Sequence, residues 1–177
     1  MEAIRIALAG NPNAGKTTVF NALTGENQHV GNWPGKTVKR ISGMFEHRGC
    51  QVQVIDLPGT YSLSSYSPEE EIARNYIVEE KPDMVVNVVD ASNLERNLYL
   101  TVQILETGAP LILLLNMGDM ADRRGVEIDV NALSEKLNGI PVIPSIANKG
   151  IGLEDLKGTI LTFDHKREAI AADEVQP

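Results

Sequence analysis

Lys16 and Thr17 are the first residues of the chain whose types and spacing point to chemistry. They close the loop Gly-Asn-Pro-Asn-Ala-Gly-Lys-Thr at residues 10–17, which lies between an apolar run and a helical pattern. This is the context of a phosphate-binding P-loop, in which Gly10 and Gly15 let successive backbone N–H groups converge on phosphate oxygens. The Lys16 ammonium then reaches the β- and γ-phosphates, and the Thr17 hydroxyl is a ligand for Mg2+. A plain glycine turn between strand and helix is the alternative.

A carboxylate follows a second strand-like run. Asp56 opens the sequence Asp-Leu-Pro-Gly at residues 56–59. An aspartate at the end of a strand is suited to hold a Mg2+-bound water, and the Gly59 N–H is suited to bond the γ-phosphate. Because Asp-x-Pro-Gly is also a good turn sequence, the segment indicates a phosphate site only in company with the loop at residues 10–17.

Two further segments follow apolar runs and are suited to read a base. Asp119, three residues after Asn116, can accept hydrogen bonds from both the ring N–H and the exocyclic amine of guanine. Adenine lacks this pair of donors, so a site that depends on them can reject it by about 10^4-fold. We expect Asn116 to tie its loop to the P-loop and the Ala147 backbone N–H to bond guanine O6. Polar turns are the alternative for both segments.

The stretch at residues 25–38 shows no clear periodicity and predicts a long mobile loop. If Thr37 ligates Mg2+ and bonds the γ-phosphate, hydrolysis removes that contact and releases the loop. Trp33, the only tryptophan, either anchors this loop or contacts the nucleotide, and the sequence favours neither.

Alternating strands and helices must position these residues. Apolar and alternating runs predict strands at residues 4–9, 39–47, 50–55, 84–89, 111–115 and 140–143. Caps and helical spacing predict helices at residues 16–24, 67–78, 93–107, 129–137 and 153–171. The pattern predicts an α/β fold: a mostly parallel sheet of six to seven strands with one antiparallel edge strand and helices on both faces. Ligands bind such sheets at the carboxyl ends of the strands.

The composition of the chain excludes several classes of protein. The chain has 177 residues and a net charge of −8, which predicts no general attraction to nucleic acid or anionic lipid. Cys50 is the only cysteine, so an internal disulfide framework is excluded, and the three histidines are scattered, so no Fe2+ site is assigned. The longest apolar run, residues 109–115, is far below the roughly 20 residues that span a bilayer. We therefore expect a soluble domain.

In this order and spacing the motifs resemble the Ras-like P-loop GTPase superfamily. Within it, residues 10–17, Asn-Ala-Leu-Thr-Gly at 21–25, Gly-Asn-Trp-Pro-Gly at 31–35 and Asp-Leu-Pro-Gly-Thr-Tyr-Ser at 56–62 resemble the cytosolic N-terminal G domain of the ferrous-iron transporter B (FeoB) family. The likeness covers residues 4–163.

The resemblance implies a GTP-binding and GTP-hydrolysing switch that regulates ferrous iron uptake. It implies a helical domain and a transmembrane domain as partners, and the cytoplasmic face of the cell inner membrane as the location. Residues 1–165 would form the G domain, and 166–177 the end of the last helix and a flexible tail leading to the helical domain. Nucleic acid is not an expected partner, and homo-oligomer formation is left open.

The cofactors implied are GTP or GDP, Mg2+ and K+. The residues assigned to nucleotide binding are Asn11, Pro12, Asn13, Ala14, Gly15, Lys16, Thr17, Thr18, Gly35, Thr37, Asp56, Gly59, Asn116, Met117, Asp119, Ser145, Ile146 and Ala147. Those assigned to catalysis are Asn13, Lys16, Thr37 and Gly59. Mg2+ is assigned to Thr17, Thr37 and, through water, Asp56, and K+ to Asn13.

Thr60 stands where Ras-like proteins carry a water-positioning glutamine, so slow intrinsic hydrolysis is expected. In relatives without an arginine finger, a K+ ion held by a P-loop asparagine supplies the missing charge, and Asn13 matches that asparagine. The chain departs from the family pattern at Gly118, at Ile146 and at Lys36, where a small or branched apolar residue is usual.

Two alternatives stay open at this point. A ribosome- or tRNA-associated GTPase of the Era type should carry a basic or RNA-binding module, against which the negative charge of the chain argues. A nucleotide-sensing module with negligible turnover would share the same binding motifs, and only an assay of GTP turnover separates it from an enzyme.

Overall fold

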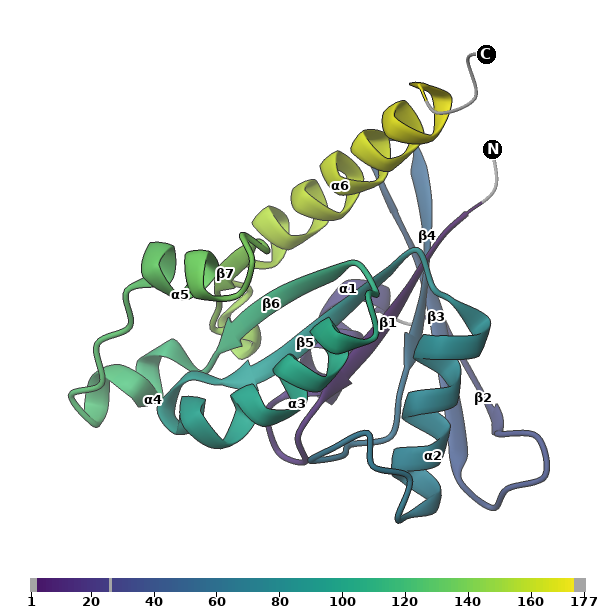
Figure 1. Ribbon diagram of the computed structural model, residues 1–177, viewed down its shortest axis with the longest axis horizontal. Coiled ribbons are helices and arrows are strands. Elements are labelled where there is room, and N and C mark those ends of the chain that lie inside the picture. Colours follow the sequence, from purple (N-terminus) through teal and green to yellow (C-terminus); the bar gives the residue numbers. More distant parts are fainter. Residues whose placement is uncertain (1–2, 26, 174–177) are drawn as a thin grey trace.

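The computed structural model describes residues 3–25 and 27–173, and its centre is a seven-stranded sheet with helices on both faces (Figure 1). The strands are β1 (Ile4–Gly10), β2 (Gln28–Asn32), β3 (Lys39–His47), β4 (Cys50–Asp56), β5 (Met84–Asp90), β6 (Leu111–Asn116) and β7 (Val142–Pro144). The helices are α1 (Lys16–Thr24), α2 (Pro68–Asn75), α3 (Leu94–Glu106), α4 (Gly118–Arg123), α5 (Val130–Lys136) and α6 (Leu153–Asp173). A π-helix, η1 (Tyr76–Glu80), continues α2, and the short 3-10 helices are η2 (Ala91–Asn93) and η3 (Ala147–Lys149).

The strands lie in the order β2-β3-β4-β1-β5-β6-β7. β1 pairs in parallel with β4 and β5, and parallel pairing continues from β5 to β6 and from β6 to β7. β3 is antiparallel to both β2 and β4, so the antiparallel pairing lies at one edge, as predicted. Gly10, Asp56 and Asn116 end three parallel strands, which brings the predicted site residues to one edge of the sheet.

The core has two layers, one on each face of the sheet. On one face α1 and α6 cover β1, β5 and β6, with Phe20 and Ile160 fully buried. On the other face α2, η1 and α3 cover the sheet, and α2 and α3 lie in front of it in Figure 1. β5 and β6 are apolar on both faces because both faces are covered, which explains their nearly unbroken hydrophobic sequences.

β2 and α4 differ from the predictions. Residues 28–32 were expected to belong to a long loop, but they pair with β3 from Gln28↔Gly43 to Asn32↔Lys39. All five residues of β2 are exposed, so the strand depends on backbone pairing and carries no apolar alternation. α4 is short and buries only Ala121, so it has no apolar stripe from which a helix could be predicted.

α6 extends through Asp173 and therefore crosses the predicted domain boundary at residue 165. Residues 174–177, where a flexible tail was expected, lie outside the described residues. The division into 1–165 and 166–177 stays a prediction. Within the described part of the chain, no helix combines the length and the hydropathy that crossing a bilayer requires.

Gly10 ends β1 directly against β5, and this contact gives a test of the fold. A Cβ on Gly10 would lie 2.5 Å from the Val88 carbonyl oxygen, a backbone atom held in the sheet. Gly10→Ala is expected to lower the free energy of unfolding by about 1–3 kcal/mol through overpacking, measured by urea titration. The control is Gly158→Ala in α6, where a Cβ meets nothing within 4 Å and should stabilise by about 0.5–1 kcal/mol. Unchanged stability of Gly10→Ala would contradict this β1–β5 contact.

Candidate functional site

The loop between β1 and α1 turns sharply at two residues with positive φ. Asn13 has φ 67° and Gly15 has φ 90°, and the Ala14 N–H donates to the Asn11 carbonyl at 3.2 Å. Gly15 is the N-cap of α1 and carries no side-chain cap. A Cβ at Gly15 would lie 2.2 Å from the Asn116 side-chain nitrogen, so this position requires glycine for space as well as for φ. The loop thus leaves backbone N–H groups and the α1 N-terminus open to an anion.

Lys16 and Asp56 form a buried ion pair at the start of α1. The Lys16 Nζ lies 2.5 Å from Asp56 Oδ1, and the two side chains are only 10% and 9% exposed. Burial raises the pKa of the Asp56 carboxyl above its ordinary value, while the Lys16 ammonium acts in the opposite direction. The pair therefore brings two of the predicted site residues, from the start of α1 and the end of β4, to one point, while their roles toward phosphate and Mg2+ stay predictions.

The Asn116 side chain joins three segments. Its amide nitrogen donates to the Ala14 carbonyl at 3.0 Å, and its amide oxygen accepts from the Ala147 N–H at 2.9 Å. The predicted tie between the Asn116 loop and the P-loop is present. The Ala147 N–H, which was expected to bond guanine O6, points at Asn116 in this structure, so its bond to a base stays a prediction.

Asp119 lies in the first turn of α4, after Met117 turns the chain with φ 62°. Lys149 of η3 donates to Asp119 Oδ2 at 3.1 Å, and this hydrogen bond lowers the pKa of the Asp119 carboxyl. The carboxylate is therefore held ionised, the form that accepts hydrogen bonds from two donors. The sequence analysis missed Lys149, whose only signal was its place two residues after the predicted Ser145–Ala147 segment.

Two neighbouring cavities share Gly15. The first, of about 530 Å³, is lined by Asn11, Pro12, Asn13, Gly15, Lys16, Thr17 and Gly59. The second, of about 510 Å³, is lined by Gly15, Thr18, Asn116, Met117, Asp119, Met120, Arg123, Ile146, Asn148 and Lys149. Most of the predicted site residues thus line one of two adjoining cavities, and Met120, Arg123, Asn148 and Lys149 are additions that the sequence motifs did not indicate.

Gly59 lies against the P-loop. A Cβ on Gly59 would meet the Pro12 backbone at 3.4 Å, and the neighbouring Thr60 N–H donates to the Gly10 carbonyl at 3.2 Å. The Thr60 hydroxyl donates to the Ser62 carbonyl at 2.7 Å and is 4% exposed. The Thr60 side chain is therefore committed to its own turn and does not replace a water-positioning glutamine.

The structure does not bring Thr37 and Gly35 to the first cavity, which the P-loop lines and which is called the phosphate cavity below. Neither belongs to the described residues that line it, and both are exposed. Trp33 resolves the alternative left open by the sequence, because it is 7% exposed and belongs to the core on the α2 face. In this structure it anchors the loop.

Every group of the site except Thr37 and Gly35 thus lies where parallel strands end, around a P-loop that opens the first helix. A sheet of this order with a site at this edge is that of the Ras-like P-loop proteins.

Comparison with known proteins identifies one family within the class of Ras-like P-loop proteins. The family described as Ferrous iron transport protein B matches residues 4–160. The chain is 54% identical over 161 residues to the Fe(2+) transporter FeoB of Salmonella typhimurium, covering 89% of this chain and 21% of that protein. It is 50% identical over 168 residues to the Fe(2+) transport protein A/Fe(2+) transporter FeoB fusion protein of Porphyromonas gingivalis, covering 94% and 20%. The chain belongs to the ferrous iron transport protein B family and spans about a fifth of the length of these relatives.

Solved structures agree with this assignment. The FeoB G-domain from Methanococcus jannaschii superposes with a TM-score of 0.82 at 51% identity, covering 93% of this chain and 99% of that one. The cytosolic domain of the T. maritima FeoB iron transporter in its GDP form II superposes with a TM-score of 0.90 at 45% identity, covering 93% and 65%. The family's Ras-like fold, inferred from the sequence, is therefore confirmed.

Removing the Asn116 amide should separate the segments that it joins. Asn116→Ala leaves the buried Ala14 carbonyl and Ala147 N–H without their partner, which should lower the free energy of unfolding by about 2 kcal/mol or more. Urea titration of the protein freed of nucleotide measures this effect. Asn131→Ala, on the exposed side of α5, is the control and should change stability by less than about 0.5 kcal/mol. Equal stability of the two variants would show that the bridge contributes little.

Proposed function

We propose that the chain is a GTP-binding and GTP-hydrolysing switch domain that regulates ferrous iron uptake across the cytoplasmic membrane. The observation that carries the proposal is the meeting of Lys16 and Asp56 with Asn116 and Asp119 at one edge of the sheet, around two cavities that share Gly15. One cavity suits the phosphates of a nucleotide and the other suits its base.

The phosphate cavity offers positive charge and donors. We assign the backbone N–H groups of Asn13 and of residues 15–17, together with the positive end of α1, to the phosphates, because the Ala14 N–H is bonded to the Asn11 carbonyl. The Lys16 ammonium is assigned to bond the phosphates while it stays beside Asp56. The Thr17 hydroxyl and the Asp56 carboxylate are oxygen ligands of the kind that Mg2+ prefers, so these residues fit the ion. Bound there, Mg2+ neutralises phosphate charge. We assign Thr37 to the same site after its loop moves inward.

The base cavity offers an ionised carboxylate. Asp119 accepts from the ring N–H and the exocyclic amine of guanine, while the hydrogen bond from Lys149 to Oδ2 lowers the pKa of the carboxyl and favours its charged form. An adenine base would leave Asp119 without these donors, so the site selects guanine. Asn116 holds the base loop against the P-loop, so that base and phosphates are bound at a fixed separation.

Hydrolysis in this site relies on backbone groups. Gly59 lies against the P-loop, and we assign its N–H to the γ-phosphate, whereas the Thr60 hydroxyl is bonded within its own turn. Among the described residues, the Thr60 side chain does not take the part of the glutamine, so we expect slow intrinsic turnover. Asn13 lines the phosphate cavity with an exposed side chain and is the residue we assign to K+, whose charge would replace that of an arginine finger.

The iron-transport role is inferred from the relatives, which are described as Fe(2+) transporters and are about five times as long as this chain. A helical and a transmembrane part of a longer protein are the proposed partners, and the cytoplasmic face of the membrane is the proposed location. An RNA-associated GTPase is disfavoured by the net charge of −8. A sensor without turnover is separated by single-turnover assay: GTP that stays intact for hours in K+ and Mg2+ would favour it.

Base selection can be tested at Asp119. Asp119→Ala should weaken GDP binding by at least 100-fold, because two guanine donors lose their acceptor, while the already weak binding of ADP should not change. Isothermal titration with GDP and ADP measures both constants. Asp122→Ala, an exposed carboxylate on the same helix, is the matched control and should bind GDP like the wild type. Similar wild-type affinities for GDP and ADP would refute the assignment.

The role of Asn13 can be tested by salt exchange. GTP turnover in K+ is expected to exceed turnover in Na+ at equal ionic strength by about 10-fold or more, a smaller gain than the roughly 10^3 to 10^5 of an arginine finger. Asn13→Ala should remove the difference and leave the rate in Na+ nearly unchanged. Phosphate release under saturating GTP and Mg2+ is the measurement. Equal rates of the wild type in the two salts would exclude the K+ role.

A further inference from the structure

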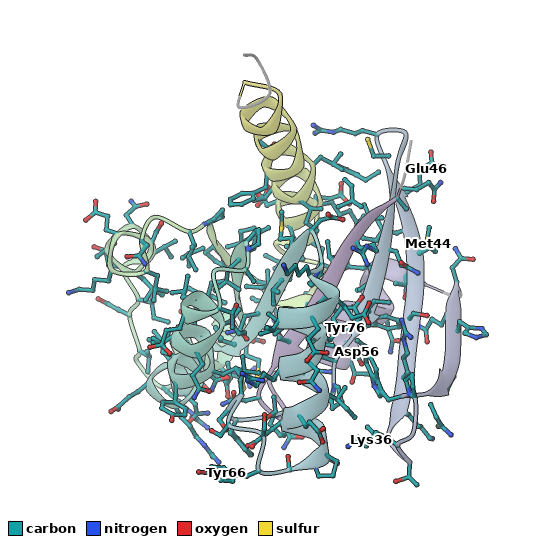
Figure 2. The ribbon with its side chains drawn as sticks, turned by 45° about the vertical axis from the view of Figure 1, so that its right-hand side comes forward. Lys36, Met44, Glu46, Asp56, Tyr66 and Tyr76 are labelled. Atoms are coloured by element: carbon teal, nitrogen blue, oxygen red, sulfur yellow. The ribbon has the colours of Figure 1, made fainter. Side chains whose placement is uncertain are left out.

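The turn at residues 33–36 is fastened to α2 by Lys36, the residue that departs from the family pattern. Lys36 Nζ lies 2.7 Å from Glu71 Oε2 in the first part of α2. The turn is closed by the Lys36 N–H bonding the Trp33 carbonyl and by the Trp33 N–H bonding the Val38 carbonyl, each at 3.0 Å. In Figure 2, Lys36 lies toward the lower end of α2, where that helix begins. The ion pair therefore joins the Thr37 loop to the helix that follows the Gly59 loop.

Trp33 provides the second attachment. Its ring meets the Tyr76 ring edge to face, with centroids 5.6 Å apart and planes at 73°. The Arg40 guanidinium covers the indole 5.0 Å from its centre. Tyr76 begins the π-helix that continues α2. Trp33 and Lys36 therefore contact the same helical segment, at Tyr76 and at Glu71, five residues apart. Single-turn π segments are frequent at functional sites.

This attachment is incomplete in ways that make it reversible. The indole N–H of Trp33 is buried, and no acceptor among the described residues takes it, which offsets part of the gain from ring contacts. A cavity of about 200 Å³ remains between the turn and the helix, lined by Trp33, Pro34, Lys36, Arg40, Glu71, Ile72, Asn75, Tyr76, Glu79 and Glu80. The Lys36 and Glu71 side chains are 36% and 44% exposed, so water weakens their attraction.

We propose that Lys36 and Glu71 are positioning residues for Thr37: their ion pair, with Trp33, tethers the loop to α2 and competes with its entry into the phosphate site. Thr37 directly follows Lys36, is exposed, and is not among the described residues that line the phosphate cavity. A movement that carries Thr37 to the γ-phosphate must stretch or break the ion pair. The tether therefore opposes only the form of the site that contains a γ-phosphate. This inference rests on the proposed GTP switch.

Trp33, as the only tryptophan, reports the tether without any nucleotide. In protein freed of nucleotide, Lys36→Met and Glu71→Gln should each raise the acrylamide quenching constant of Trp33 about 2-fold, because the ring spends more time exposed. The charge-swapped double variant Lys36→Glu with Glu71→Lys restores the attraction and should return quenching to the wild-type value. Unchanged quenching in both single variants would overturn the tether, whether or not the chain binds GTP.

The effect on the site is measured with nucleotides that differ by one phosphate. Both single variants should bind a non-hydrolysable GTP analogue with Mg2+ about 2- to 5-fold more tightly, the range expected for a partly exposed ion pair, and bind GDP as the wild type does. Lys157→Met, which breaks the Lys157–Glu154 pair on α6 at the same 2.7 Å distance, is the matched control and should change neither affinity.

The two arms separate the tether from the proposed function. Equal changes for GDP and the GTP analogue would indicate a general structural effect and would overturn the positioning role. Weaker binding of the analogue by the single variants would be the opposite of the expected change and would also overturn the positioning role. If the wild type binds no guanine nucleotide, the proposed function fails, and the quenching result alone decides whether the tether exists.

Discussion

The side-chain amide of Asn116 is the contact on which the geometry of the site depends. The amide donates to a carbonyl 102 residues away in the sequence and accepts from an N–H 31 residues away. Asn116 is only 3% exposed. Water cannot replace these partners, so the P-loop, the end of β6 and the loop after β7 keep one arrangement. Gly15 is glycine partly because the same amide occupies the space where a side chain would lie. A single residue thus fixes the distance between the two cavities.

The elements that depend on local signals were predictable from the sequence. The β-branched run of β5, the P-loop between β1 and α1, and the caps of α2 and α5 each carry their signal within a few residues, and the structure has them at or near the expected positions. β2 escaped prediction because its strand character comes from pairing with β3 and not from its own side chains. The strand order, which decides where Asp56 meets Lys16, was expected only through the general rule for parallel sheets.

The contacts that the sequence did not indicate are those between charged side chains of distant segments. Lys149 reaches Asp119 across 30 residues and Lys36 reaches Glu71 across 35, and no spacing rule encodes such pairs. Trp33 was ambiguous for a similar reason: an aromatic residue in a loop is equally suited to core and ligand until its neighbours Tyr76 and Arg40 are known. The motifs therefore identify the chemistry of the site, while the state of its loop depends on contacts outside the motifs.

The open edge of the sheet adds a property that the site alone does not have. β2 pairs on one side only, every one of its residues faces water, and it runs directly into the turn that carries Trp33 and Lys36. Such a strand detaches at low cost compared with the central strands. The amide hydrogens of β2 should exchange early. Each residue of β2 that leaves the sheet lengthens the unpaired segment before Thr37 by roughly 3.3 Å. The distance that the unpaired segment can span is thus adjustable, because residues released from the edge of the sheet lengthen it.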